Sequence, residues 1–113
     1  MTRVYIAAPY SVGDQVLNTR RVIDVAEKLI TMGYVPFVPH LYHLWHIASP
    51  HGWRYWLDLD CAWLEACNVM LRLSGHSAGC DEEIDYAGKH GIPIVYSAEE
   101  LVERFPPPLL EGG

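Results

Sequence analysis

A cluster of carboxylates follows a loop of small residues in the second half of the chain. The loop, residues 74–79, reads Ser-Gly-His-Ser-Ala-Gly and leads into a predicted helix whose first turn holds Asp81, Glu82 and Glu83. Acidic residues in a first helical turn complement the helix dipole, and that role suffices for Asp81 and Glu82. Glu83 differs because it borders the apolar face of the helix, near the expected sheet edge. Its carboxylate is therefore a candidate for chemistry.

A second candidate carboxylate lies in segment 56–64, WLDLDCAWL. Asp60 stands about one helical turn before Trp63 and Leu64, which are expected to pack inward, so it lies at the margin of a pocket. On position alone, a solvated helix surface explains Asp60 as well. The apolar residues spaced to share the inward face of this helix are Trp56, Leu59, Trp63 and Leu64.

The elements that must position these carboxylates alternate between strands and helices. Short β-branched and apolar runs predict the strands, and apolar residues at helical spacing predict the helices. Residues 39–53, rich in His and aromatic residues, are expected to be irregular. The predicted strands are 3–8, 34–38, 69–73 and 92–96, and the predicted helices are 15–32, 54–67, 80–90 and a short one after the capping box 97–100.

This alternation predicts an α/β fold, a flavodoxin- or Rossmann-like three-layer sandwich with a parallel sheet of four or five strands. The expected strand order is 2-1-3-4, with the second strand at an edge because Pro36 cannot donate to a ladder. The winding direction reverses between the first and third strands, and ligands bind at such switch points. The loops 7–14 and 74–79 are therefore expected to form the site.

Bulk properties narrow the function classes. The 113 residues fit one domain, 1–105, followed by a flexible Pro-rich tail, 106–113. A net charge of −6 without a Lys/Arg cluster argues against nucleic-acid binding. Three cysteines without a Cys-x-x-Cys pair, and an N-terminus without a signal peptide or membrane span, predict a cytoplasmic protein.

Three segments, in order along the chain, match one known pattern. They are VYIAAPY (4–10), DLDCAWLEACNVML (58–71) and SAGCDEEIDYAGKHGIPIV (77–95), and in the last of these Ser77, Gly79 and Glu83 have the expected spacing. With these segments the chain resembles the nucleoside 2-deoxyribosyltransferase superfamily, particularly its short, phage-type relatives, and also 2′-deoxynucleoside 5′-phosphate N-hydrolases.

The resemblance implies roles for individual residues. Glu83 would be the nucleophile at C1′, Asp60 the acid that protonates the departing base, and Tyr5 the residue that holds the Glu83 carboxylate. No cofactor and no metal are expected, and the partner is a small nucleoside or nucleotide. The residues expected to bind substrate are Ala8, Pro9, Tyr10, His40, Trp56, Ser77 and Gly79, with Ser77 at the 5′ end of the sugar.

Several alternatives stay open at this point. The nucleotide-hydrolase branch carries an arginine in its first loop, where this chain has Ser11 and Val12, which weakens the case for a 5′-phosphate. Transfer of deoxyribose, hydrolysis of a nucleoside 5′-monophosphate and a non-catalytic nucleotide-binding module are all compatible with the scaffold. A flavodoxin-like electron carrier has only fold analogy in its favour.

The segment around PHLYHLWH has two further interpretations. His40, His43 and His46 are spaced by three residues, as in some metal sites, but no helix signal or carboxylate pairing supports a metal here. The segment is expected instead to form a lid or wall over the base, an ordinary packed loop, or a subunit interface. Large apolar residues near the edge strand, such as Leu41 and Trp45, predict a homodimer or higher homo-oligomer.

Overall fold

The computed structural model describes residues 1–107, so the predicted tail, 106–113, lies mostly outside the described residues. Strands and helices alternate as predicted, and each boundary falls within a few residues of its expected place. In chain order the elements are β1 (Arg3–Ala7), α1 (Gln15–Thr31), β2 (Val35–Phe37), the 3-10 turn η1 (Pro39–Leu41), α2 (Tyr42–Ala48), α3 (Trp53–Glu65), β3 (Val69–Arg72), α4 (Ala78–Lys89), β4 (Ile94–Val95) and α5 (Ala98–Arg104).

The four strands form one parallel sheet in the order β2-β1-β3-β4, which confirms the predicted order. β1 is central, and its Tyr5 is in register with Phe37 of β2 and Met70 of β3. β2, which contains Pro36, is an edge strand as expected. β1 and β3 are neighbours, so their carboxyl ends open side by side and the loops that follow them meet.

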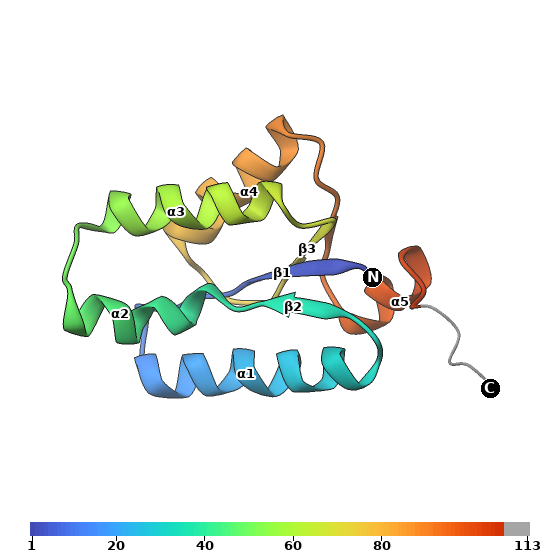
Figure 1. Ribbon diagram of the computed structural model, residues 1–113, viewed down its shortest axis with the longest axis horizontal. Coiled ribbons are helices and arrows are strands. Elements are labelled where there is room, and N and C mark those ends of the chain that lie inside the picture. Colours follow the sequence, from blue (N-terminus) through green and yellow to red (C-terminus); the bar gives the residue numbers. More distant parts are fainter. Residues whose placement is uncertain (108–113) are drawn as a thin grey trace.

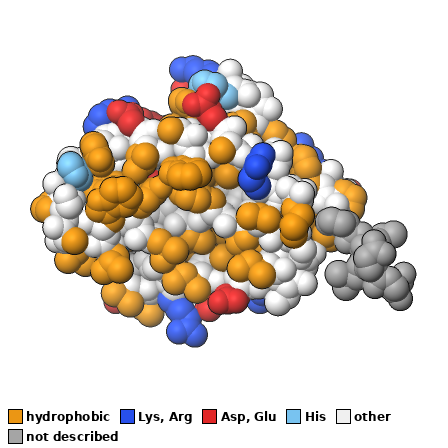
Figure 2. Space-filling view, viewed as in Figure 1, with side chains coloured by type: hydrophobic (Ala, Val, Ile, Leu, Met, Phe, Trp, Pro, Cys, Tyr) orange, Lys and Arg blue, Asp and Glu red, His pale blue; other side chains and the backbone are white. Residues whose placement is uncertain are grey.

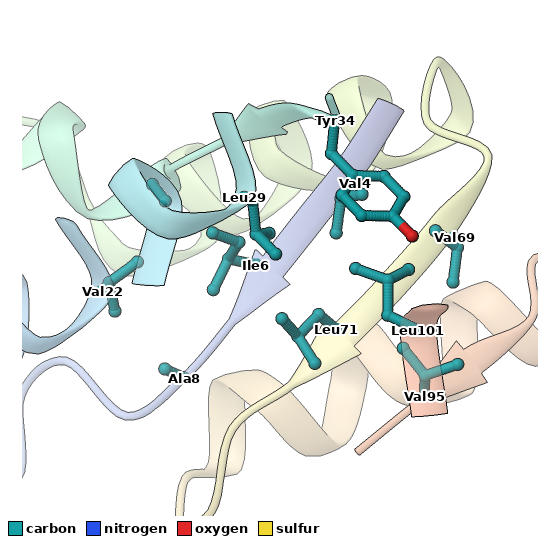
Figure 3. Close-up of a cluster of buried hydrophobic side chains, with 11 residues drawn as sticks. Val4, Ile6, Ala8, Val22, Leu29, Tyr34, Val69, Leu71, Val95 and Leu101 are labelled. Carbon is teal, nitrogen blue, oxygen red and sulfur yellow. The ribbon is translucent and has the colours of Figure 1, made fainter. Parts of the chain in front are cut away.

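Helices cover both faces of the sheet (Figure 1), with α1 on one side and α3 and α4 on the other. Side chains alternate across the strands, so Val4, Ile6 and Leu71 pack against Leu29 of α1 and Leu101 of α5 (Figure 3). Each fully buried aliphatic side chain of this kind stabilises the fold by about 1.5–3 kcal/mol.

The opposite face of the sheet holds a second, smaller cluster. Tyr5 and Met70 project from the strands toward Leu64 of α3 and toward Cys80 and Ala87 of α4. The two predicted carboxylates lie on α3 and α4, the helices that cover this face. The even-numbered side chains of β1 thus pack toward α1 and α5, and the odd-numbered ones pack toward α3 and α4.

The expectation that residues 39–53 are irregular is wrong. They contain η1 and the seven-residue helix α2, and η1 begins with Pro39 at its first position. α2 has no side-chain cap at its N-terminus, so the usual sequence signal of a helix start is missing. Contacts of Tyr42 with Phe37 and Trp56 hold the helix in place instead.

The predicted inward face of α3 is also partly wrong. The buried residues of this helix are Leu57, Cys61 and Leu64. Trp63 is 47% exposed and stacks on Phe37, with ring centroids 5.3 Å apart. The large indole therefore covers the edge of the sheet rather than filling the core.

The surface near the edge strand is apolar. Figure 2 shows hydrophobic side chains in a band across the middle of the face, with charged side chains mostly toward its upper and lower borders. Val35 of β2 and Leu41 and Trp45 beside it are exposed. Among the described helices, none is long and apolar enough to cross a membrane.

Candidate active site

A pocket of ≈ 560 Å³ opens at the carboxyl ends of β1 and β3. Its wall comes from the loop after β1, from η1 and α2, from α3, and from the loop that leads into α4. The loops after β1 and β3 are the two that the strand order predicts to form the site. The volume falls in the range of small-molecule sites.

Glu83 lies on the buried side of α4 and is 6% exposed. Tyr5, fully buried on β1, donates its hydroxyl proton to Oε2 of Glu83. Burial raises the pKa of Glu83 to about 7, although the Tyr5 hydrogen bond and the charge of Arg72 act in the opposite direction. Burial and the neighbouring carboxylates raise the pKa of Tyr5 well above its ordinary value, so Tyr5 remains a donor.

Asp60, on α3, lines the same pocket as Glu83. Burial, and then the charge of Glu83, raise the pKa of Asp60 to about 8. Its Oδ1 atom is buried and has no hydrogen-bond partner within residues 1–107. The Tyr5 hydrogen bond and Arg72 favour the ionised form of Glu83, and the charge of Glu83 in turn favours the protonated form of Asp60.

Arg72, the last residue of β3, is a charged group that sequence analysis did not include. It is 9% exposed and pairs in register with Ala7 of β1. Its side chain therefore lies on the sheet face toward α3 and α4. Its guanidinium donates to the carbonyl oxygens of Leu73 and Gly75, the second at 2.6 Å. Arg72 thus shapes the loop before α4 and places a positive charge near Glu83. An arginine inside the apolar run VMLRL was the available signal, because buried charges need partners.

The loop before α4 fits closely against the loop after β1. Gly75 has φ +123°, and a Cβ there would lie 2.6 Å from Cγ of Pro9. Pro9 therefore supports the loop from behind and does not line the pocket. Ser77 caps α4 by accepting a hydrogen bond from the N–H of Cys80 at 3.2 Å. Glycine at position 79 leaves room near Trp53, whose Nε1 would be 3.9 Å from an added Cβ.

His40 and Tyr10 form the part of the wall that follows β1. Nε2 of His40 donates to the carbonyl of Pro9 at 3.1 Å, which makes Nδ1 the unprotonated nitrogen. Burial lowers the pKa of His40, so the ring is neutral. Nδ1 of His40 and the hydroxyl of Tyr10 are buried without partners in the described part of the chain. Like Oδ1 of Asp60, these atoms belong to pocket-lining residues, and such orphaned groups indicate a ligand site.

Aromatic side chains and histidines form the outer wall. Tyr42 stacks on Trp56 with ring centroids 5.7 Å apart, and His43, His46 and His51 also line the pocket. Within residues 1–107, no group of three or more His, Cys, Asp or Glu side chains is placed to hold a metal ion. The wall is therefore suited to a flat, partly polar ligand.

The structure brings together the predicted site residues from widely separated segments. All of them line the pocket except Tyr5, which contacts Glu83 from behind, and Pro9. Sequence analysis did not include His76 and Cys80, which also line it. Cys80 lies within the matched segment 77–95 and His76 directly precedes it, so their proximity to Ser77 and Glu83 in the sequence was the available signal.

A family model described as a domain of unknown function (DUF7768) matches residues 2–97. The chain belongs to this family. No match is found among curated protein sequences.

Two solved structures share the fold of this DUF7768 chain. A 2-deoxyribosyltransferase from the psychrotolerant bacterium Bacillus psychrosaccharolyticus matches with a TM-score of 0.58 and 14% identity, over 82% of this chain and 69% of that one. A 2-desoxiribosyltransferase from Leishmania mexicana matches with a TM-score of 0.63 and 16% identity, over 99% of this chain and 76% of that one. The fold that the sequence resemblance implied is confirmed.

Proposed function

We propose that this chain cleaves the N-glycosidic bond of a (deoxy)nucleoside or nucleotide and transfers the deoxyribosyl group to another base. One observation carries the proposal: the carboxyl groups of Glu83 and Asp60 lie on the wall of one pocket, where Tyr5 holds Glu83 and Oδ1 of Asp60 is buried without a partner in the described residues. Because Tyr5 and Arg72 favour the ionised form of Glu83, whose charge raises the pKa of Asp60, a nucleophile and an acid can coexist near neutral pH. The fold shared with two 2-deoxyribosyltransferases agrees with this chemistry.

The proposed reaction has two displacements at C1′ of the sugar. In the first, a carboxylate oxygen of Glu83 bonds to C1′ as the C1′–N bond breaks, and Asp60 gives its proton to the departing base. Tyr5 keeps Oε2 of Glu83 oriented through its hydroxyl. In the second, a nitrogen of the incoming base attacks C1′, Glu83 leaves as a carboxylate, and Asp60 recovers a proton. Two inversions retain the configuration.

The remaining pocket residues would hold the two ends of the substrate. Ser77 and Gly79, at the N-terminus of α4, would receive the 5′ end of the sugar. Trp56 would stack on the base, and the small side chain of Ala8 permits close approach. Tyr10 and His40 would bind through their unpartnered polar atoms, and Pro9 would act indirectly by positioning His40.

The second candidate function is hydrolysis of a deoxynucleoside 5′-monophosphate. The start of α4 favours it, because free N–H groups at a helix N-terminus bind phosphate. Against it, the described lining of the pocket includes no Lys or Arg side chain. Rates with a deoxynucleoside and with its 5′-monophosphate separate the two: a strong preference for the monophosphate would assign a phosphate to the N–H groups near Gly79.

The test of the proposal is base release from a panel of nucleosides, followed by chromatography. Glu83→Ala is expected to lower the rate by several orders of magnitude, because a covalent nucleophile is lost. Glu82→Ala is the matched control: Glu82 is the preceding residue, its side chain is 47% exposed, and it pairs with Arg54 on the surface. Near-normal activity of Glu83→Ala would overturn the mechanism.

Transfer and hydrolysis are distinguished by partition of the intermediate. A donor nucleoside is supplied with increasing amounts of a different free base. If transfer competes with hydrolysis at a shared glycosyl-enzyme, the new nucleoside rises while free sugar falls. Free sugar that stays constant at millimolar base, with no new nucleoside, would identify a dedicated hydrolase.

We also propose the molecular setting of this activity. Residues 1–105 would act as one domain, and a second copy would cover the apolar band beside β2, giving a homodimer or larger homo-oligomer. A monomer in light scattering at micromolar concentration would contradict the assembly. The unpaired Cys61, Cys67 and Cys80 support a reducing, cytoplasmic location, and the acidic charge supports small-molecule rather than nucleic-acid partners.

A further inference from the structure

His46, on the outer turn of α2, accepts two hydrogen bonds at the same ring nitrogen. The indole Nε1–H of Trp56 donates to Nδ1 at 2.7 Å, and the backbone N–H of His51 donates to it at 3.2 Å. Trp56 belongs to α3, and His51 belongs to the connection between the two helices. His46 therefore ties that connection and the Trp56 ring to α2.

These two bonds fix the tautomer of His46. An indole N–H and a backbone N–H can only donate, so Nδ1 must carry a lone pair. The proton of the neutral ring then resides on Nε2. His46 lines the pocket, and Nε2 has no hydrogen-bond partner within residues 1–107. The ring of this pocket-lining residue thus has one free N–H donor, and its tautomer is fixed by Trp56 and His51.

We propose that His46 donates its Nε2–H to the nucleobase and makes the pocket selective for bases with a carbonyl oxygen at their outer edge. Hypoxanthine, guanine, uracil and thymine belong to this class, whereas adenine and cytosine carry an amino group at that edge. The inference rests on the proposed function, because it assigns the aromatic wall around Trp56 to a base.

The selectivity follows from hydrogen-bond pairing. A carbonyl oxygen accepts the Nε2–H, whereas an exocyclic amino group is a donor and leaves two donors facing each other. Leaving such groups unpaired in a partly buried site costs enough to weaken binding by about tenfold or more. The base ring itself would be held by stacking against Trp56, which every base permits, so the hydrogen bond and not the stacking decides between oxo and amino bases.

Two substitutions test the Nε2–H donor of His46 separately from the hydrogen bonds at Nδ1 that join α2 to α3. His46→Asn places an amide oxygen near the position of Nδ1, so it can still accept from Trp56 and His51, but it has no group at the position of Nε2. Trp56→Phe keeps an aromatic ring but removes the shorter of the two hydrogen bonds to Nδ1, so that only the backbone N–H of His51 still favours the Nε2–H tautomer. His90→Asn is the control, because His90 ends α4 outside the pocket lining.

The experiment measures equilibrium binding of free hypoxanthine and adenine, and of uracil and cytosine, to the full chain by calorimetry. The wild type and His90→Asn are expected to bind the oxo bases about tenfold more tightly. In His46→Asn the preference should fall to about twofold or less, and in Trp56→Phe it should fall by a smaller factor because the His51 N–H still donates to Nδ1; both variants should keep a cooperative unfolding transition. Nitrogen-15 spectra of the wild type should show His46 protonated at Nε2.

Three results would overturn the inference: equal binding of oxo and amino bases by the wild type, equal weakening of all bases in His46→Asn, or a proton on Nδ1. The binding ratios do not depend on turnover. If the wild type released no base from any nucleoside but kept the preference, the proposed function would fail and the role of His46 would stand. If the wild type released base but bound oxo and amino bases equally, the proposed function would stand and the role of His46 would fail.

Discussion

Replacing Asp60 with asparagine is expected to stabilise the folded protein, because Asp60 must ionise inside a partly closed pocket. The pKa of this carboxyl is raised from its ordinary 3.8 to about 8 by burial and by the charge of Glu83. Below about pH 4 the carboxyl is protonated in both the folded and unfolded chains, and it contributes no difference. Above that pH the unfolded chain ionises first, so the wild type loses stability until the folded carboxyl also ionises near pH 8.

The size of this effect follows from the pKa shift. Each pH unit between about 4 and 8 corresponds to about 1.4 kcal/mol, which sets a ceiling of roughly 6 kcal/mol above pH 8. Water in the open pocket solvates the charge in part. At pH 8 we therefore expect the free energy of unfolding of Asp60→Asn to exceed that of the wild type by about 2–3 kcal/mol. Near pH 4 the two proteins should be nearly equal.

Urea unfolding at several pH values between 4.5 and 8.5 measures this difference. Asp58→Asn is the matched control, since Asp58 lies on the same helix with a side chain that is 67% exposed and pairs with Arg54 at 3.8 Å. That control should show no comparable dependence on pH. A difference between Asp60→Asn and wild type that is flat with pH, or that favours the wild type at pH 8, would refute a buried acid at this position.

Further predictions concern the groups behind the pocket. Tyr5→Phe removes the hydrogen bond that lowers the pKa of Glu83, so the acid limb of the kcat/KM profile should move to higher pH; an unmoved limb would contradict this role. Gly75→Ala should cost about 1–3 kcal/mol in urea unfolding because φ is +123° and the new Cβ would meet Pro9, whereas wild-type stability would argue against that packing. Gly88→Ala, in open space on α4, should stabilise by about 0.5 kcal/mol in the same assay, and a loss would contradict the helical geometry.

The sheet could be predicted because its signals are local. Short apolar runs bounded by Gly and Pro give the strands, and Pro36 places β2 at an edge. Together with the right-handed crossover rule, these signals leave few strand orders. The position of the site follows from the order, since the loops after β1 and β3 must meet.

The wall around α2 could not be predicted in the same way. α2 begins without a capping side chain and directly follows Pro39, so its helical state depends on Tyr42 packing between Phe37 and Trp56. Such contacts join residues that are distant in sequence. The face of α3 was misjudged for a similar reason, because Trp63 covers the sheet edge where a hydrophobic pattern alone predicts burial.

For the site itself, residue type and spacing indicated Glu83 and Asp60, but not what sets their ionisation. The roles of Tyr5 and Arg72 depend on the strand register, which brings both to the sheet face beneath α4. Spacing along the chain contains no information about which of two carboxyl groups loses its proton first. That order depends on burial and on neighbouring charges, which require the folded structure.

The two faces of the sheet differ in how freely they can be altered. Val4, Ile6 and Leu71 face a cluster of apolar groups between the sheet, α1 and α5, while Tyr5 and Arg72 lie on the opposite face and act on Glu83. A heat-resistant form of the protein could therefore be obtained by redesigning the buried apolar side chains of the α1 and α5 layer, provided that Asn18 and Arg21 of α1, which bind the loops after β1 and β3, are kept. Libraries of altered substrate preference would instead be confined to α2, α3 and the start of α4, and the alternation of β1 would keep the two sets of changes independent.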